Sequence, residues 1–317
     1  MTDQLKKFIR YLIKNSLNLS PNEKLLIVTD ETLTDVGEII WQVAKRITPE
    51  LINIKFFHKN NHGNQLPLII REALVTCDAG IVLTQKYLEQ SLFNEARQNG
   101  SRVIVVQSAT TKMIERAFNT NYKKISMVSR KLADLMSIGK KLDITTPSGT
   151  EATVSLQKTK GFPKTGMAQN PGEFTFLPAG EACIILNGKY ISGKIILDRI
   201  AGKKKKLQHP ITLNLNKGQI TQIKGKSEAE ILRKEIRKFG PNGRKIYEFG
   251  IGTNDNILIG HSRQEDDKSY GTVHISFGEN KKTKVNSKIT EAIKGLLLKP
   301  TVHLDGKKII ENGNILV

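Results

Sequence analysis

The sequence contains few cysteines and no long apolar run. Its 317 residues include two cysteines, Cys77 and Cys183, which lie far apart and form neither a disulfide framework nor a CxxC metal or redox pair. No segment approaches the run of about 18 apolar residues that a membrane-spanning helix needs, and the first residues lack the apolar core of a signal peptide. We therefore expect a cytoplasmic protein with no membrane partner.

The sequence also lacks the short motifs of nucleotide and nucleic-acid binding. No glycine-rich fingerprint follows the first expected strand, where Thr29, Asp30 and Glu31 stand instead, and no P-loop lysine is present. There is no RNP motif or zinc-finger spacing, and aromatic residues make up only 6% of the chain, which leaves few rings for base stacking. We expect no nucleic-acid partner.

Charge of one sign is in excess. The chain has 50 basic and 30 acidic side chains, a formal net charge of +20. The excess is greatest between Lys203 and Lys245, a stretch that contains 13 lysines and arginines but only three glutamates. Such a stretch either attracts an acidic partner or forms a solvated surface that aids solubility. We favour the solvated surface, because the basic residues are spread over several expected strands, a turn and a helix.

Two regions of the chain show different secondary-structure patterns. Up to about residue 145, short apolar runs alternate with helical stretches, which is typical of βαβ units and a parallel sheet. Beyond that point, short strands and turns predominate. The sequence predicts an α/β fold with a Rossmann-like N-terminal domain over 1–145, and an α+β, mainly antiparallel C-terminal domain over 146–317 that holds a metal site or peptide cleft.

Two histidine positions are candidates for metal binding. His274 lies in an expected strand whose alternation places it on the face opposite Val273 and Ile275. His303 and Asp305 are two residues apart, so both can project from one face of a strand and bind one ion. His274 and the pair His303 and Asp305 are therefore candidate metal ligands.

Two glutamates are further candidates, because each adjoins an apolar run. Glu173 follows an Asn-Pro-Gly turn, and Glu248 stands between Tyr247 and Phe249. A carboxylate in such a run is costly to bury unless it is paired, hydrogen-bonded or bound to a metal. The alternative is a glutamate that faces water on an edge strand. The acidic run at 265–267 allows a cation site, but a solvated acidic loop is the more usual interpretation.

Several segments, taken in order along the chain, resemble the aminopeptidase T family, the thermophilic-type leucyl aminopeptidases, in a short form. Each segment is a weak signal alone, and their common order makes the resemblance specific. The segments are Pro21–Asp30, Asp143–Thr150, Asn170–Glu173, Glu248–Asn254, Asp267–Lys268, Gly271–Ile275 and Pro300–Gly306.

The resemblance implies a hydrolase, a two-metal exopeptidase that removes N-terminal residues from a peptide substrate. It implies a cofactor of divalent metal, zinc or else cobalt or manganese, held in the C-terminal domain by Glu173, Glu248 and His274. Glu248 is the candidate for the carboxylate that bridges the two ions. Two such cations lower the pKa of a bridging water and polarise the scissile carbonyl.

The sequence departs from the family pattern at one ligand pair. The family has a His-x-Asp pair after the Gly-Thr-Val-His-Ile strand, whereas this chain has no histidine between His274 and His303. Glu291 could replace the pair, His303 and Asp305 could move in from the next strand, or the pair is lost. We favour loss over relocation.

This departure leaves other functions open. One is a catalytically inactive homologue, with or without a metal. It would bind a peptide or protein partner in the cleft where active members of the family bind their substrate. Another is a mononuclear-iron ring-cleaving dioxygenase, because the fold that the resemblance implies is similar to the fold of such enzymes.

The resemblance and the expected edge strands of the C-terminal domain also predict a homodimer, because a symmetric partner can cover such edges. Light scattering at micromolar concentration should therefore give a mass of about two 35.4 kDa chains. A mass equal to one chain would contradict this prediction.

Overall fold

The computed structural model describes residues 3–57, 65–186, 191–278 and 292–317, and the chain forms two compact units. The N-terminal unit consists of Met1–Ser126 and Thr165–Ala179, and the C-terminal unit consists of Met127–Lys164 and Gly180–Val317. The sequence predicts one boundary near residue 145. The chain instead passes between the units after residues 126, 164 and 179, because one later strand joins the N-terminal sheet.

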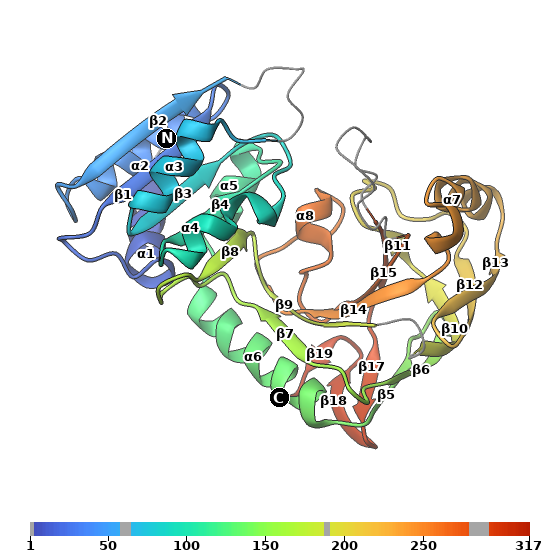
Figure 1. Cartoon of the computed structure of the whole chain (residues 1–317). Coiled ribbons are helices and arrows are strands. Elements are labelled where there is room, and N and C mark those ends of the chain that lie inside the picture. The colour runs from blue at the N-terminus through green and yellow to red at the C-terminus, as the bar shows by residue number, and fades with distance from the viewer. Residues whose placement is uncertain (1–2, 58–64, 187–190, 279–291) are drawn as a thin grey trace. The chain divides into compact units, whose positions relative to one another are not determined.

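The N-terminal unit is built on a parallel sheet with strand order β2-β1-β3-β4-β8, as Figure 1 shows. Apolar residues alternate between its two faces: Leu25 and Ile27 pack with α1, α2 and α5, whereas Leu26 and Val28 pack with α3 and α4. Central strands buried on both faces are typical of parallel sheets, so the predicted fold class of this region is confirmed. The strands are β1 (Leu25–Asp30), β2 (Leu51–Phe56), β3 (Ala79–Leu83), β4 (Arg102–Val106) and β8 (Phe174–Leu177).

Helices connect and cover these strands. Their bounds are α1 (Asp3–Tyr11), the π-helix η1 (Leu12–Ser16), α2 (Thr34–Ala44), α3 (Leu68–Thr76), the 3-10 helix η2 (Gln90–Phe93), α4 (Asn94–Gln98) and α5 (Thr111–Phe118). The next helix, α6 (Tyr122–Ile138), begins in this unit and continues into the C-terminal unit, where Leu132 and Met136 pack in the core. None of the helices in the described ranges is both long and apolar enough to cross a membrane.

The C-terminal unit contains two sheets in which every described strand pair is antiparallel, as predicted. One has eight strands, in the order β13-β12-β10-β6-β5-β17-β18-β19, and the other has six, in the order β11-β16-β15-β14-β9-β7.

The strands of the eight-stranded sheet are β5 (Lys141–Thr145), β6 (Glu151–Ser155), β10 (Ile191–Leu197), β12 (Ile211–Asn216), β13 (Gln219–Lys224), β17 (Thr301–Leu304), β18 (Lys307–Glu311) and β19 (Asn314–Ile315). Those of the six-stranded sheet are β7 (Gly161–Lys164), β9 (Glu181–Ile185), β11 (Arg199–Ile200), β14 (Ile246–Gly252), β15 (Val273–Phe277) and β16 (Ile293–Leu297). The remaining helices are α7 (Ser227–Arg237), the 3-10 helix η3 (Gly240–Asn242) and α8 (Arg263–Asp266).

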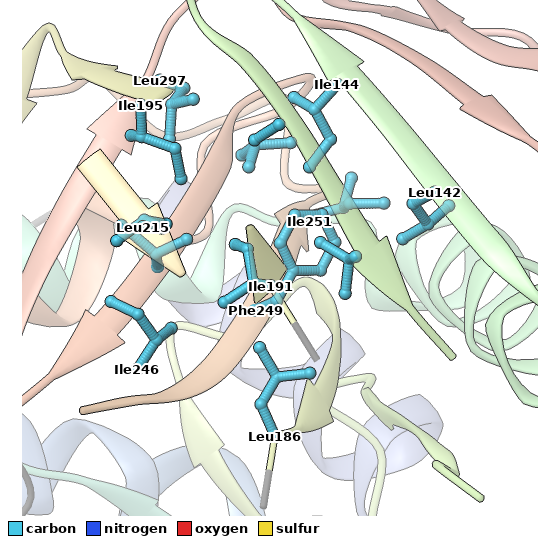
Figure 2. Close-up of a cluster of buried hydrophobic side chains, with 14 of the residues drawn as sticks. Leu142, Ile144, Leu186, Ile191, Ile195, Leu215, Ile246, Phe249, Ile251 and Leu297 are labelled. Carbon is cyan, nitrogen blue, oxygen red and sulfur yellow. The ribbon is translucent and has the colours of Figure 1, made fainter. Parts of the chain in front are cut away.

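A single apolar core lies between these two sheets. Leu142, Ile144 and Ile195 of the eight-stranded sheet share it with Phe249 and Ile251 of the six-stranded sheet (Figure 2). Because side chains alternate along a strand, the residues between these apolar positions of the six-stranded sheet project from its other face. That other face carries the polar residues described below.

The shared core predicts a large effect of Phe249→Ala, because the Phe249 side chain is fully buried. We expect a loss of about 3–5 kcal/mol in the free energy of unfolding, measured by urea denaturation followed by circular dichroism. The control is Phe57→Ala, whose side chain is 79% exposed and whose loss should cost less than about 0.5 kcal/mol. Equal effects of the two substitutions would contradict this description of the core.

Candidate functional site

The outer face of the six-stranded sheet carries a row of buried polar side chains. In β15, Val273 and Ile275 point into the core, so His274 points to the opposite face, as the sequence predicts. In β14, the same alternation places Glu248 and Gly250 on this outer face. The sheet therefore brings two of the predicted ligands, Glu248 and His274, to the same surface.

Strand register brings further charged groups to this face. Gly250 lies opposite His274 on one side and Cys183 on the other, and Glu181 is two residues from Cys183 on β9. Glu181 is paired in turn with Lys164 of β7, and Lys294 of β16 is paired with Ser276. Asp267 and Lys268, which follow α8, complete the group through contacts with these side chains. We call the seven charged or imidazole side chains the charge cluster: Lys164, Glu181, Glu248, Asp267, Lys268, His274 and Lys294.

The imidazole of His274 lies at the centre of the cluster and is fully buried. Its Nε2 atom is 3.3 Å from Oε2 of Glu181 and 3.5 Å from Oε1 of Glu248. The Ser276 hydroxyl donates a hydrogen bond of 2.9 Å to the same Oε1 of Glu248. His274 therefore faces two carboxylates, one of which is also held by a neighbouring hydroxyl.

Three lysines neutralise the three carboxylates. Lys294 contacts Asp267 and lies 3.3 Å from Glu248, and Lys268 lies 2.8 Å from Asp267. Lys164 contacts Glu181 and lies 3.8 Å from Glu248. Three negative and three positive charges sum to zero when the imidazole is neutral, so the cluster is charge-balanced by the protein itself.

The ionisation of the cluster follows from these contacts. Burial alone would raise the pKa of Glu181, Glu248 and Asp267, but the adjacent ammonium groups outweigh burial and hold the pKa of all three carboxyls below the usual range. Burial alone would lower the pKa of Lys164 and Lys294, and the carboxylates instead raise it above the usual value. All five groups are therefore charged at neutral pH.

Gly250 provides the space that the His274 ring occupies. A Cβ atom at position 250 would lie 2.3 Å from Cε1 and 2.5 Å from Nε2 of His274, closer than nonbonded atoms approach. Any larger residue at this position of β14 would displace the ring. The glycine in the Glu-Phe-Gly-Ile-Gly segment thus positions a functional side chain on the neighbouring strand.

Three members of the cluster fit a single metal ion. Glu181, Asp267 and His274 each offer one ligand atom, and these atoms lie within 4.8 Å of one another. An ion with bonds of about 2.0–2.2 Å brings its ligand atoms to about 3–4 Å, so a small side-chain adjustment suffices. Within the described part of the chain, neither ring nitrogen of His274 has a partner in hydrogen-bond geometry, although both are buried. An imidazole left in that state is suited to bind a metal.

The neighbouring thiol is neutral in this site. Burial raises the pKa of Cys183 to about 12, so the free thiol stays protonated at neutral pH. Because the thiolate is the form that attacks a substrate, Cys183 is not a nucleophile there.

Glu173 does not belong to the unit that holds this cluster. Glu173 lies in the N-terminal unit just before β8, where its carboxylate accepts hydrogen bonds from the backbone N–H groups of Gln169 and Asn170 and from the Asn170 side chain. These hydrogen bonds stabilise the turn that contains Pro171 and Gly172. That local role, rather than metal binding, accounts for a glutamate at this position.

His303 and Asp305 also lie elsewhere, on the eight-stranded sheet. His303 pairs with Asp143 of β5, and Asp305 follows the end of β17 with a positive φ of 48°. The Asp305 carboxylate accepts hydrogen bonds from the backbone N–H groups of Lys140 and Lys141. Relocation of this pair into the site is therefore not observed. Glu291, the other suggested replacement, lies outside the described residues.

Glu181 and the lysines are not among the ligand candidates of the sequence, and Asp267 lies in an acidic run for which a solvated loop was favoured over a cation site. Glu181 begins the apolar run of β9, so the rule that selected Glu248 also applies to it. Asp267 was expected in a solvated loop, but it is 1% exposed and paired with two lysines. The lysines carry no distinguishing signal in a chain with 50 basic side chains.

Comparison with known proteins identifies two related groups. The family model NicX, 2,5-dihydroxypyridine 5,6-dioxygenase, matches residues 57–317. The solved structure of 2,5-dihydroxypyridine dioxygenase from Pseudomonas putida KT2440 superposes with a TM-score of 0.80 at 18% identity, covering 100% of this chain and 99% of that one. Wild-type AmpT from Thermus thermophilus superposes with a TM-score of 0.67 at 13% identity, covering 99% of each chain. A comparison with curated proteins finds no match.

These findings correct the expected activity. The likeness to AmpT and to the Pseudomonas structure supports the fold that the sequence resemblance implied, but the family model that matches is that of a dioxygenase family. The predictions of an aminopeptidase, of a hydrolase and of an inactive homologue are therefore wrong. The resemblance gave the fold but not the activity, because several of its segments form the framework: Thr146–Thr150 makes the turn between β5 and β6, and Gly250 and Gly271 permit close packing.

The charge balance predicts that Lys294→Met is strongly destabilising, because it leaves Asp267 and Glu248 without their shared cation. We expect a loss of about 3–5 kcal/mol in the free energy of unfolding by urea denaturation. The matched control is Lys224→Met at an exposed position of β13, which should change it by less than about 0.5 kcal/mol. Unchanged stability of Lys294→Met would show that the cluster does not depend on its lysines.

Proposed function

Because this chain belongs to the 2,5-dihydroxypyridine 5,6-dioxygenase family, we propose that it is a metal-dependent dioxygenase that opens a hydroxylated, nitrogen-containing ring. A single divalent ion would be held by Glu181, Asp267 and His274. Among the interpretations of the sequence, the family match favours the ring-cleaving dioxygenase.

The observation that carries this proposal is the buried imidazole of His274, held against carboxylates and without a hydrogen-bond partner in the described structure. Mixed histidine and carboxylate ligands with positions left open for substrate are typical of non-haem iron(II) oxygenases, whose usual set is two histidines and one carboxylate. This chain offers one histidine and two carboxylates, both acceptable ligands for iron(II). We therefore propose iron(II) in place of the zinc expected from the aminopeptidase resemblance.

The ligand geometry supports one ion rather than two. In the described part of the chain, the ligand atoms that lie within 4.8 Å of one another come from Glu181, Asp267 and His274, and Glu248 is not in this group. The Glu248 carboxylate instead accepts a hydrogen bond from Ser276. The bridging role expected for Glu248 is therefore not part of the proposal.

The residues of the charge cluster would hold and orient the metal ligands. The metal, when bound, lets the ring and dioxygen react at one centre. His274 is held in place by the packing against Gly250, and Asp267 is held by Lys268 and Lys294. Burial of these groups excludes bulk water, which would otherwise compete for the ligand positions.

The test uses the full chain loaded anaerobically with iron(II), 2,5-dihydroxypyridine and ¹⁸O₂. A dioxygenase adds both oxygen atoms to the ring, whose own electrons reduce the dioxygen, so no external reductant is needed. Mass spectrometry should show a product heavier than the substrate by two ¹⁸O atoms. The variant His274→Ala should lose roughly 100-fold or more of the rate, because a metal ligand is removed.

His303→Ala is the matched control, because His303 lies on the other sheet of the same unit. It should keep the parent rate. No oxygen uptake by the iron-loaded protein, or an equal loss in both histidine variants, would contradict the proposed function.

A further inference from the structure

Lys164 differs from the other two lysines of the charge cluster in its accessibility. Its side chain is 44% exposed, compared with 16% for Lys294 and 12% for Lys268. Lys164 is the last residue of β7, which is the terminal strand in the order of the six-stranded sheet. It is therefore the cation of this cluster that a molecule arriving from solvent can reach most readily.

The Lys164 ammonium also has hydrogen-bonding capacity to spare. An ammonium carries three N–H donors. Its ion-pair partners in the described structure are Glu181, in close contact, and Glu248, whose nearest oxygen is 3.8 Å away and beyond hydrogen-bond distance. At least one donor can therefore meet a ligand that approaches from the exposed side.

The charge of the cluster indicates what kind of ligand this is. The carboxylates and ammonium groups sum to zero, so one divalent ion at Glu181, Asp267 and His274 leaves an excess of two positive charges. An uncompensated charge in a buried site is costly. A ligand that carries an ionised oxygen, such as a ring hydroxylate or carboxylate, lowers this cost, and an uncharged ring does not.

We propose that Lys164 binds an anionic oxygen of the substrate beside the metal position and so makes the site selective for ionised hydroxylated rings. This inference rests on the proposed function, because the metal position is taken from it. Lys164 acts as a specificity-determining residue: Glu181 holds its ammonium in place, and the exposed side of the ammonium meets the ligand.

The opposing interpretation is that Lys164 only neutralises Glu181. A purely structural lysine affects the binding of charged and uncharged rings equally, whereas an anion-binding lysine affects only the charged ring. The two roles can therefore be separated with a matched pair of ligands.

The experiment uses the full chain loaded with Zn²⁺, which does not react with dioxygen, and titrated with 4-nitrocatechol, a coloured ring whose hydroxyl ionises near neutral pH. Lys164→Met should weaken its binding by about tenfold or more, since a hydrogen bond to a charged group is lost. Lys164→Arg keeps the charge and should stay within about threefold of the parent. The control Lys160→Met, at an exposed position just before β7, should bind as the parent does.

The uncharged ligand is 1,2-dimethoxy-4-nitrobenzene. It should bind the parent protein more weakly than 4-nitrocatechol does. Its affinity for the Lys164→Met variant should equal its affinity for the parent. Thermal unfolding of each variant checks its fold, and Lys164→Gln replaces Lys164→Met if the methionine variant does not fold, with the same loss expected.

A separate Zn²⁺ titration by calorimetry distinguishes the two proposals. Absence of Zn²⁺ binding that depends on His274 would overturn the proposed function. If Zn²⁺ binds and Lys164→Met leaves the 4-nitrocatechol affinity unchanged, or weakens both rings equally, the role of Lys164 is overturned while the metal site stands.

Discussion

Charge compensation between three buried carboxylates and three lysines is the interaction on which the site depends. An isolated carboxylate in the interior of a protein costs several kcal/mol, and Glu181 and Asp267 have almost no exposed surface. The lysine ammonium groups make this burial possible and keep the carboxylates ionised, which is the form that binds a metal. These lysine pairs therefore stabilise the buried carboxylates from which the proposed site is built.

The six-stranded sheet provides the geometry for this chemistry. Its inner face is fixed by the apolar core that it shares with the eight-stranded sheet, and strict alternation then fixes the side chains of the outer face. Gly250 gives the His274 ring its place across the strand pair. The same fold occurs in a dioxygenase and in AmpT, so the framework does not determine the reaction.

Much of the architecture could be predicted from the sequence, because apolar periodicity reports directly on strands and helices. The parallel and antiparallel regions and the orientation of His274 follow from that periodicity. The position of β8 could not be predicted, since pairing between Phe174 and Val103 depends on contacts distant in sequence. For the same reason, Glu173 resembled a ligand in the sequence but closes a turn in the structure, whereas Asp267 resembled a solvated residue and is buried.

The most direct test of this account is the number and place of bound metal ions. Crystals of the full chain soaked in Mn²⁺, with diffraction data collected at the manganese absorption edge, locate each ion by its anomalous signal. The proposed site should give one peak in this unit, at about 2.2 Å from an oxygen of Glu181, an oxygen of Asp267 and a nitrogen of His274. Two peaks bridged by Glu248, or no peak at these three residues, would contradict it.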